Sequence, residues 1–250
     1  MTAEEKSTAG IRLREVSAGY RGKAVLHDIS LDLTPGQITV ILGENGSGKT
    51  TLLKVMAGLL PYTGSVRIDG QELNTLSAGE RAAQIALLSQ MNSSYFSYTV
   101  EETVRMGRYR FHTGLFSGTS GEDRERVTAC LDAVDLAEAR DVRIGELSGG
   151  QLQRVYLARM FAQDAAWLFL DEPTNHLDLK YRARLEQDLS GSHRSVVAVY
   201  HDIRAALGMA DQVILLKSGS VIAAAPPDQI LPSGALNEAF AMDVVSYLGL

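Results

Sequence analysis

The stretch Gly43–Thr51, which reads GENGSGKTT, has the residue types and the spacing of a loop that binds phosphate. It follows the apolar run Ile38–Leu42 and precedes LLKVMAG, a segment with helical character. Glycines let backbone N–H groups close around phosphate oxygens, and the positive end of the following helix adds to the attraction. In this pattern Lys49 reaches the β- and γ-phosphates and Thr50 is a ligand of Mg²⁺. The loop therefore predicts a nucleotide site made by Gly43, Glu44, Asn45, Gly46, Ser47, Gly48, Lys49, Thr50 and Thr51.

Two acidic residues, Asp171 and Glu172, end a second apolar run, WLFL. Such a run is typical of a central strand in a parallel sheet, and the ligands of these sheets lie beyond the carboxyl ends of the strands. We expect Asp171 to hold Mg²⁺, directly or through water, and Glu172 to act as the general base that polarises the attacking water. One acid alone would be a turn residue, but a pair beside a phosphate loop favours hydrolysis of the bound nucleotide.

Gln90 and His201 also stand directly after apolar runs, Ile85–Ser89 and Val196–Tyr200. About one strand–helix–strand crossover separates Glu172 from His201, so their strands are expected to be neighbours with both side chains at the same edge of the sheet. We expect Gln90 to sense Mg²⁺ and the attacking water, and His201 to contact the γ-phosphate.

These candidate residues need a sheet whose strands mostly run parallel. Short β-branched runs bounded by turn residues recur along the chain, and helical stretches separate several of them. The runs are Ile38–Leu42, Val66–Ile68, Ile85–Ser89, Trp167–Leu170, Val196–Tyr200 and Val213–Leu216. The sequence therefore predicts an α/β fold in a single domain over residues 1–250.

Further parts are expected around the parallel strands. Ile11–Leu33 has the pattern of antiparallel strands with turns at SAGYRGK and TPG, and residues 90–160 have helical spacing. The prediction is a nucleotide-binding core of residues 11–89 and 161–222, a helical subdomain inserted at 90–160, and a C-terminal tail at 223–250. Tyr20, in the antiparallel region, is expected either to stack on adenine or to be an ordinary hairpin tyrosine.

The composition narrows the class of protein. The formal net charge is −6, which argues against a nucleic-acid-binding protein that neutralises phosphates broadly. Cys130 is the single cysteine, so no disulfide can form within the chain, as is usual in a reducing compartment. No apolar run approaches the ~18 residues of a membrane span, and the polar start MTAEEKSTAG has no signal-peptide character. We expect a soluble, cytosolic chain that reaches a membrane only through a partner.

The segment ELSGGQLQRV, Glu146–Val155, places two glycines where a helix should begin. Ser148 and Gln151 have the spacing of a capping box, in which each side chain bonds the backbone N–H of the other residue. Glycine costs about 1 kcal/mol relative to alanine inside a helix, so Gly149 and Gly150 need a separate reason.

In this order and spacing, GENGSGKT, Gln90, LSGGQ, LFLDEP and His201 resemble the motifs of ATP-binding subunits of ABC transporters. The resemblance covers nearly the whole chain and implies a P-loop NTPase core that binds ATP with Mg²⁺. In that family the backbone amides of the LSGGQ serine and glycines face the γ-phosphate of an ATP held by a second subunit. The resemblance thus implies that Ser148, Gly149 and Gly150 bind ATP across a homodimer, with close approach allowed by the glycines.

The same resemblance adds Gln151 and Asp178 to the residues that contact the ATP of the second subunit. Asp178 could equally be the N-cap of the helix that follows it. With one phosphate loop and one LSGGQ per chain, two chains in a head-to-tail C2 arrangement make two composite sites.

The stretch Tyr98–Phe116 resembles the corresponding segment of ATPases that drive uptake of iron–siderophore complexes, haem and cobalamin. Its markers are Thr99–Val100 and Gly107–Arg108–Tyr109, although Arg110 stands where that group often has proline. The resemblance implies an importer subunit at the cytoplasmic face of the membrane, peripheral through its permease. It also implies two permease subunits and an external substrate-binding protein as partners, and no nucleic acid.

Two alternatives accompany the importer interpretation. The aromatic residues Tyr95, Phe96 and Tyr98 either line a groove for a permease helix or pack the helical subdomain on the core. The alternative function is that of a soluble ABC ATPase of iron–sulfur cluster assembly, which the Gly-Arg-Tyr segment and Gln151 disfavour. A module that binds nucleotide without hydrolysing it is disfavoured by Glu172 and His201 together.

Overall fold

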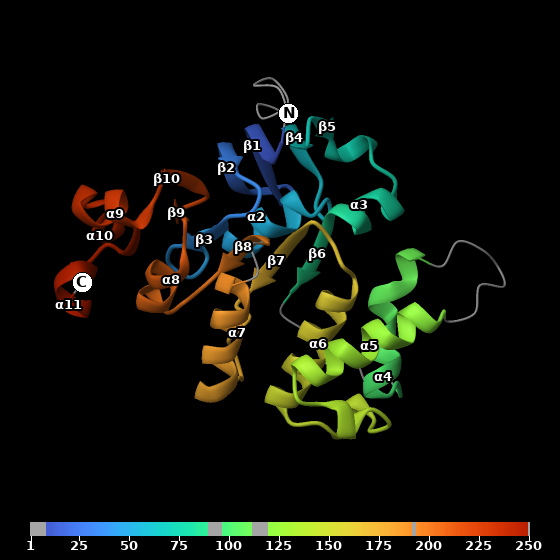
Figure 1. Cartoon of the computed structure of the whole chain (residues 1–250). Coiled ribbons are helices and arrows are strands. Elements are labelled where there is room, and N and C mark those ends of the chain that lie inside the picture. The colour runs from blue at the N-terminus through green and yellow to red at the C-terminus, as the bar shows by residue number, and fades with distance from the viewer. Residues whose placement is uncertain (1–8, 90–96, 112–119, 192–193, 250) are drawn as a thin grey trace.

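The computed structural model describes residues 9–89, 97–111, 120–191 and 194–249, which form two sheets and the helices around them (Figure 1). The smaller sheet and the larger sheet lie on opposite sides of helix α2, Lys49–Met56 (Figure 1). A group of helices lies beside the larger sheet, and the C-terminal helices lie at the other end of the molecule (Figure 1).

The larger sheet has the strand order β10-β9-β3-β8-β7-β6. Its strands are β3 Ile38–Leu42, β6 Ile85–Leu88, β7 Trp167–Asp171, β8 Ser195–Val199, β9 Gln212–Lys217 and β10 Ser220–Ala225. The strands from β9 to β6 pair in parallel, and β10 pairs antiparallel with β9. β3, β7 and β8 are buried along their whole length, as is usual for strands covered on both faces. The predicted parallel sheet is confirmed, as is the predicted pairing of the strands that precede Glu172 and His201.

The smaller sheet has the order β2-β1-β4-β5, and each of its pairs is antiparallel. Its strands are β1 Ile11–Tyr20, β2 Lys23–Leu33, β4 Tyr62–Ile68 and β5 Gln71–Glu72. This confirms the antiparallel region predicted over Ile11–Leu33. Val66–Ile68, which was grouped with the runs of the main sheet, lies instead in β4 of the smaller one. Val66 and Ile68 are buried while Arg67 between them is exposed, the pattern of a strand with one covered face.

Helix α2 joins the two sheets into one core. Its side chains Leu52, Leu53 and Val55 are fully buried in the same apolar cluster as Leu13 of β1 and Phe169 of β7. The phosphate loop at the start of α2 is therefore anchored to both sheets.

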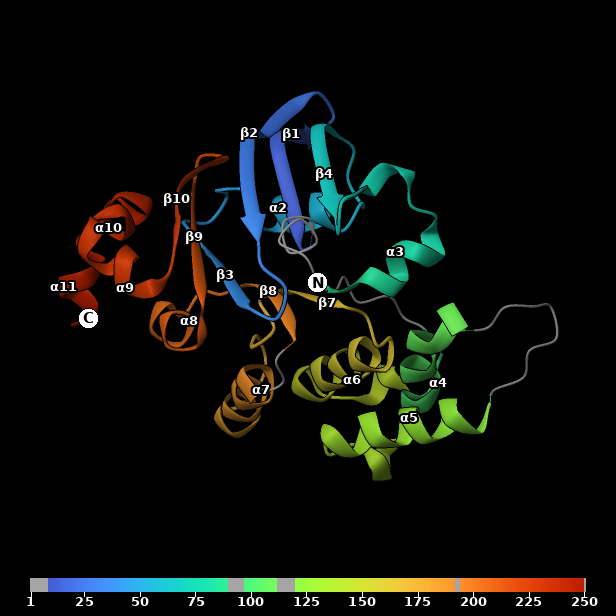
Figure 2. The ribbon, with the colours of Figure 1, turned by 45° about the horizontal axis from the view of Figure 1, so that its top comes forward.

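The helical group consists of α4, Val100–Arg105, α5, Gly121–Ala133, and α6, Gly149–Ala162 (Figures 1 and 2). Helix α6 contacts both the group and the sheet. Val155 and Ala158 pack among the helices, whereas Leu157 and Met160 pack in the apolar cluster of the larger sheet. The expected boundary at residue 160 falls inside α6, and the division into core, subdomain and tail stays a prediction.

The remaining helices cover the sheets and their ends. They are α3 Ala78–Gln84, α7 Leu179–Gly191, α8 Ile203–Met209, α9 Pro227–Ile230, α10 Ala235–Phe240 and α11 Val244–Leu248, with 3-10 turns at Leu73–Thr75 (η1), Met106–Phe111 (η2), Ala137–Ala139 (η3), Ile144–Glu146 (η4) and Leu231–Ser233 (η5). In the stretch expected to be the C-terminal tail, Ile230, Leu236 and Val244 are buried in the apolar cluster of the larger sheet. None of the helices that the structure describes combines the length and the apolar character required to span a bilayer.

Candidate nucleotide-binding site

The phosphate loop Gly43–Thr51 connects β3 to α2, as predicted. A Cβ on Gly43 would lie 2.1 Å from the carbonyl oxygen of Leu216, so the neighbouring strand β9 leaves no room for a side chain. The loop is held further by a hydrogen bond from the N–H of Gly219 to the carbonyl of Ser47, at 2.9 Å. The sequence pattern therefore forms a loop that its surroundings fix in place.

Lys49 lies within the curve of this loop. Its ammonium group donates to the carbonyl oxygens of Gly43 and Glu44, both at 2.9 Å, and only 7% of the residue is exposed. Burial lowers the pKa of the Lys49 ammonium below its ordinary value, while the carboxylates of Glu172 and Asp171 oppose that shift. A cation is thus held at the place where the pattern predicts phosphate oxygens.

Thr50 and Asp171 meet across the sequence. The hydroxyl of Thr50 donates to Oδ1 of Asp171 at 3.1 Å. Asp171 is 3% exposed, and among the described residues its other oxygen, Oδ2, has no hydrogen-bond partner. Burial raises the pKa of Asp171, and the hydrogen bond from Thr50 acts in the opposite direction. A buried carboxylate oxygen beside a hydroxyl is the donor set that Mg²⁺ prefers, so these two residues fit the predicted ion.

Glu172 and His201 are in direct contact. Nε2 of His201 lies 2.6 Å from Oε1 of Glu172, and the side-chain amide of Asn175 donates to Oε2 of the same carboxylate. The contact arises because Asp171 pairs with Val199, so the residues that follow the two strands lie together. Glu172 also has a left-handed φ of 54°, a conformation found more often at functional sites than elsewhere. His201 is therefore placed to orient the carboxylate of the expected general base, and its contact with the γ-phosphate stays a prediction.

The start of α6 lies opposite these acids. A cavity of about 360 Å³ is bordered by Asp171, Glu172 and Asn175 on one side and by Gly149 and Tyr156 of α6 on the other. The predicted capping box is confirmed: the N–H of Ser148 donates to Gln151 Oε1 at 2.9 Å, and the N–H of Gln151 to Ser148 Oγ at 3.3 Å. Ser148 and Gly149 are exposed to solvent.

The two glycines of LSGGQ have different surroundings. A Cβ on Gly150 would lie 2.8 Å from the carbonyl oxygen of His176, which requires a shift of the backbone. A Cβ on Gly149 would meet the side chain of His176 at no less than 3.7 Å, an ordinary contact. Packing within the chain therefore explains why residue 150 is glycine. It does not explain why residue 149 is glycine, because a Cβ there would make only ordinary contacts.

Other expected site residues lie around this centre. Tyr20 is the last residue of β1, is 42% exposed and pairs with Lys23 of β2. Val25 follows Lys23 by two residues, and its side chain lies 3.6 Å from a Cβ built on Gly48. The hairpin of Tyr20 thus borders the phosphate loop. Gln90, Tyr95 and Phe96 lie outside the described residues, whereas Tyr98 is described and 43% exposed.

Asp178 is the N-cap of α7, the second of its two expected roles. Its Oδ1 accepts from the N–H of Tyr181 at 3.0 Å, and its carbonyl accepts from the N–H of Arg182 at 2.9 Å. A contact of Asp178 with the nucleotide of a second chain stays a prediction. Leu179, the next residue, is 83% exposed.

Two functional neighbours were not assigned from the sequence. Asn175 follows Glu172 by three residues, a spacing at which a turn brings side chains together. Arg108 was noted only as a marker of resemblance, and the structure shows it 4% exposed and paired with Asp123. No local pattern distinguishes a buried arginine from an exposed one.

Comparison with known proteins agrees with this geometry. The family model described as "ABC transporter" matches residues 26–175. The petrobactin import ATP-binding protein YclP of Bacillus subtilis is 34% identical over 94% of this chain and 94% of its own length. The hemin import ATP-binding protein HmuV of Pseudomonas entomophila is 40% identical over 88% of each chain. The ferric enterobactin transport ATP-binding protein FepC of Escherichia coli is 33% identical over 95% of this chain and 89% of its own.

Solved structures agree as well. A dimeric structure of MJ0796, a bacterial ABC transporter cassette, has a TM-score of 0.77 and 29% identity over 87% of this chain and 98% of that chain. A dimeric post-hydrolysis state of the same cassette, bound to ADP and Pi, has a TM-score of 0.76 and 28% identity with the same coverage. The chain therefore belongs to the ABC transporter family, as one of its ATP-binding cassettes.

Proposed function

We propose that this chain is the ATP-hydrolysing subunit of an importer that takes up an iron–siderophore, haem or cobalamin-type substrate through a membrane permease. The iron–siderophore and haem classes are supported by the relatives named above, which are ATP-binding proteins of petrobactin import, hemin import and ferric enterobactin transport. The observation that supports ATP hydrolysis by this chain is the meeting of Thr50 with Asp171 and of Glu172 with His201 at one edge of the sheet.

The chemistry proposed for this edge is attack of water on the γ-phosphorus of ATP. Lys49 and the loop amides bind the β- and γ-phosphates, and Glu172 accepts the proton of the attacking water as the bond to ADP breaks. His201 and Asn175 hold the Glu172 carboxylate by its two oxygens, so that it faces the water in one orientation. Thr50, Asp171 and Gln90 would hold Mg²⁺, which when bound neutralises charge on the phosphate oxygens.

A second copy of the chain would complete each site. Gly149, the first residue of α6, is exposed to solvent, and the backbone N–H groups of a helix start, which have no partner within the helix, bind anions. Leu179 is a large apolar side chain that is 83% exposed, which suits a surface covered by another subunit. In a head-to-tail pair, each ATP would contact Lys49 of one copy and Ser148, Gly149, Gly150, Gln151 and Asp178 of the other.

The pair would bind two permease subunits at the cytoplasmic face of the membrane, with an external substrate-binding protein delivering the cargo. ATP favours the closed pair because it binds that state better than it binds the separated chains. Hydrolysis removes the ATP that bridges the two chains, so the pair can open. The exposed Tyr98 supports a contact surface for the permease on the helical group.

The site is tested by Glu172→Gln, which removes the base but leaves the phosphate loop intact. This variant is expected to bind ATP, fail to hydrolyse it and sediment as a dimer in analytical ultracentrifugation with ATP and Mg²⁺. The matched control combines Glu172→Gln with Lys49→Ala, which is expected to lose ATP binding and remain monomeric. A Glu172→Gln protein that stays monomeric at saturating ATP would contradict the shared site.

The transport role is tested in cells that lack the gene. Uptake of a labelled iron–siderophore complex, haem or cobalamin is measured after return of the wild-type chain or of Lys49→Ala. The wild-type chain is expected to restore uptake of one of these cargoes and to co-purify with a multi-span permease in detergent. Equal uptake with Lys49→Ala, or co-purification with a soluble scaffold in place of a permease, would exclude the importer role.

A further inference from the structure

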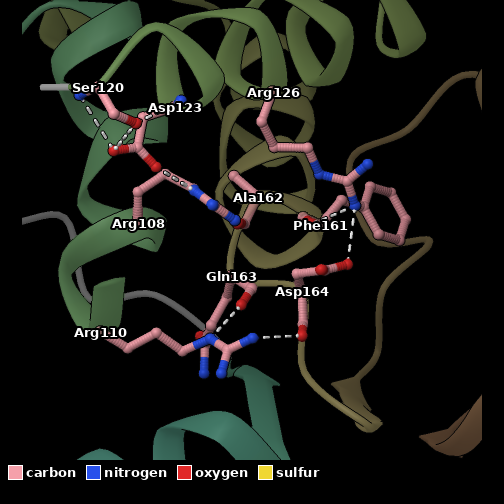
Figure 3. A network of polar contacts seen from close by, with 9 residues as sticks. All are labelled: Arg108, Arg110, Ser120, Asp123, Arg126, Phe161, Ala162, Gln163 and Asp164. Atoms are coloured by element: carbon pink, nitrogen blue, oxygen red, sulfur yellow. Dashed lines mark hydrogen bonds and ion pairs between the residues drawn. The ribbon is translucent and has the colours of Figure 1, made fainter. Parts of the chain in front are cut away.

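The C-terminal end of α6 is surrounded by three arginines, two from η2 and one from α5 (Figure 3). Arg126 donates to the carbonyl oxygen of Phe161 at 3.3 Å, and Arg108 donates to that of Ala162 at 3.0 Å. Arg110 donates to the carbonyl oxygens of both Gln163 and Asp164, each at 2.8 Å. We call Arg108, Arg110 and Arg126 the arginine cluster.

Four consecutive carbonyl groups are thus satisfied at the place where a helix leaves its last carbonyls without partners. Guanidinium groups suit this place because each offers several N–H donors in a fixed plane, and positive charge is favourable at a helix C-terminus. Local capping by a glycine would have been enough to end a helix. Use of three long side chains from two other elements, η2 and α5, fixes this end of α6 relative to those elements.

Arg108 is the most constrained member of the arginine cluster. Its Nε lies 2.8 Å from Oδ1 of Asp123, and the two side chains are only 5% and 4% exposed. Asp123 lies in the first turn of α5, where the hydroxyl of Ser120 also donates to it at 2.9 Å (Figure 3). Arg108 therefore joins the start of α5 to the end of α6 through charge-assisted hydrogen bonds.

Close packing supports the same attachment. A Cβ on Gly107 would lie 2.3 Å from the carbonyl oxygen of Arg159, so η2 lies directly against the last turn of α6. The guanidinium carbons of Arg108 and Arg110 lie 3.6 and 4.0 Å from the ring centre of Phe111. The Gly-Arg-Tyr-Arg-Phe segment is therefore built around the end of α6.

The nucleotide core holds the same end from another direction. The side-chain amide of Gln163 donates to the carbonyl oxygens of Ala82 and Ile85, both at 2.8 Å. The backbone N–H of Ala166 donates to Ala83 at 3.3 Å. The C-terminal end of α6 is thus the junction of α5, η2 and the core, while its N-terminal end carries the exposed Ser148 and Gly149.

The length of α6 makes its far end sensitive to this junction. With 14 residues at ~1.5 Å per residue, α6 is about 21 Å long. A rotation of about 5° at the C-terminal end would move Ser148 by roughly 2 Å on a helix of this rise. A displacement of about 1 Å at a reacting site can cost roughly 100-fold in rate.

We infer that the arginine cluster consists of positioning residues for the ATP site shared between two subunits. It holds the C-terminal end of α6 so that Ser148 and Gly149 at the other end meet the γ-phosphate bound by the partner. The inference rests on the proposed function, because it presupposes that α6 contacts ATP across a dimer.

The test uses Arg110→Ala with Arg126→Ala in the Glu172→Gln chain, since Arg108→Ala would leave Asp123 buried without its counter-ion. This variant retains the Arg108–Asp123 pair and so is expected to fold. ATP binding to the monomer, measured by calorimetry at low protein concentration, is expected to stay within about twofold of the parent because Lys49 and its loop are unchanged. The dissociation constant of the ATP-bound dimer is expected to rise at least tenfold.

The matched control is Arg140→Ala. Arg140 directly follows η3, pairs with Glu101 at 3.1 Å and donates to the hydroxyl of Thr128 at 3.2 Å, so its side chain contacts α4 and α5 and not the end of α6. It is expected to leave dimerisation unchanged. The variant Arg110→Lys with Arg126→Lys is expected to keep part of the affinity that the alanine variant loses, because lysine keeps the charge but offers fewer donors.

The outcomes separate the two proposals. Dimerisation of the Arg110→Ala, Arg126→Ala variant as tight as that of the parent, or an equal loss in Arg140→Ala, would overturn the role of the arginine cluster while leaving the shared ATP site in place. Absence of an ATP-bound dimer in the Glu172→Gln parent itself would overturn the proposed function and this inference together.

Discussion

Gly149 gives the sharpest test of a site shared between two chains, because its own chain has room for a side chain there. Gly149 is the first residue of α6 after the N-cap Ser148, and a Cβ would approach His176 no closer than 3.7 Å. Gly149→Ala is therefore expected to fold as well as the parent. If its backbone faces the phosphate of a partner's ATP, the added methyl group would fill the space that the phosphate needs.

Gly149→Ala should raise the stability of the separated chain and lower the affinity of the dimer, and the two effects can be estimated separately. Alanine is preferred to glycine in a helix by up to about 1 kcal/mol, so the separated chain should gain stability, with a Tm higher by at most about 2–4 °C. A hydrogen bond to a charged group contributes about 1.5–3 kcal/mol, and one lost bond in each of two sites would total about 3–6 kcal/mol. At about 1.4 kcal/mol per tenfold, the dissociation constant of the dimer should rise about 100- to 20,000-fold.

The assay compares Glu172→Gln chains with and without Gly149→Ala, by thermal unfolding without nucleotide and by analytical ultracentrifugation with ATP. Gly121→Ala is a close control. Gly121 is also the first helical residue after a serine N-cap in a capping box, and nothing lies within 4 Å of its expected Cβ. It should change the Tm in the same direction and leave dimerisation unaltered.

The reasoning would be refuted if Gly149→Ala dimerised with ATP as tightly as its parent. It would also be refuted if Gly121→Ala weakened the dimer as much as Gly149→Ala does. Gly150→Ala should behave differently from both, because its Cβ would lie 2.8 Å from the carbonyl oxygen of His176. It is expected to lower the Tm even without nucleotide.

Substitutions at three further residues test the other side of the site. Burial raises the pKa of Asp171, so its charged form costs stability above that pKa, and the fold gains stability as the pH falls toward it. Asp171→Asn should therefore not lower the Tm without nucleotide at neutral pH and should flatten its pH dependence, while Mg²⁺-dependent ATPase activity falls at least about 100-fold. If Asp171→Asn lowered the Tm without nucleotide, the conclusion that the buried charge of Asp171 destabilises the fold would be wrong. His201→Ala should reduce kcat about 100-fold with ATP binding retained, because Glu172 loses the ring that orients it; unchanged kcat would remove His201 from the mechanism. Tyr20→Ala should raise the KM for ATP about 5- to 150-fold, and Tyr20→Trp should preserve it, if the ring stacks on adenine; an unchanged KM would make it a hairpin tyrosine.

Local sequence was enough where the physical cause is local. Apolar runs such as Ile38–Leu42 predicted buried strands because successive side chains of a strand point to opposite faces. A run that is apolar throughout must therefore be covered on both faces. Ser148 and Gln151 predicted a helix start because the capping box involves residues three positions apart. The pairing of β7 with β8 followed from the length of the crossover between Glu172 and His201.

Local sequence was not enough where the partner is distant. The run Val66–Ile68 looked like the other strands, and only pairing with β1 assigned it to the smaller sheet. Arg108 carries the same charge as the half-buried Arg105 and Arg110 near it, and its full burial depends on Asp123 and on the end of α6.

By itself the sequence determined that this protein binds a nucleotide phosphate, that two acids follow a buried strand, and that a helix begins at Ser148, since each of these depends on residues close together in the chain. Only the tertiary structure decided that Thr50 meets Asp171, that His201 holds Glu172, and that Gly150 but not Gly149 is confined by its own chain. The physical reason is that hydrogen bonds and close packing depend on distances in space. Those distances were set by which strands pair and which helices pack between them.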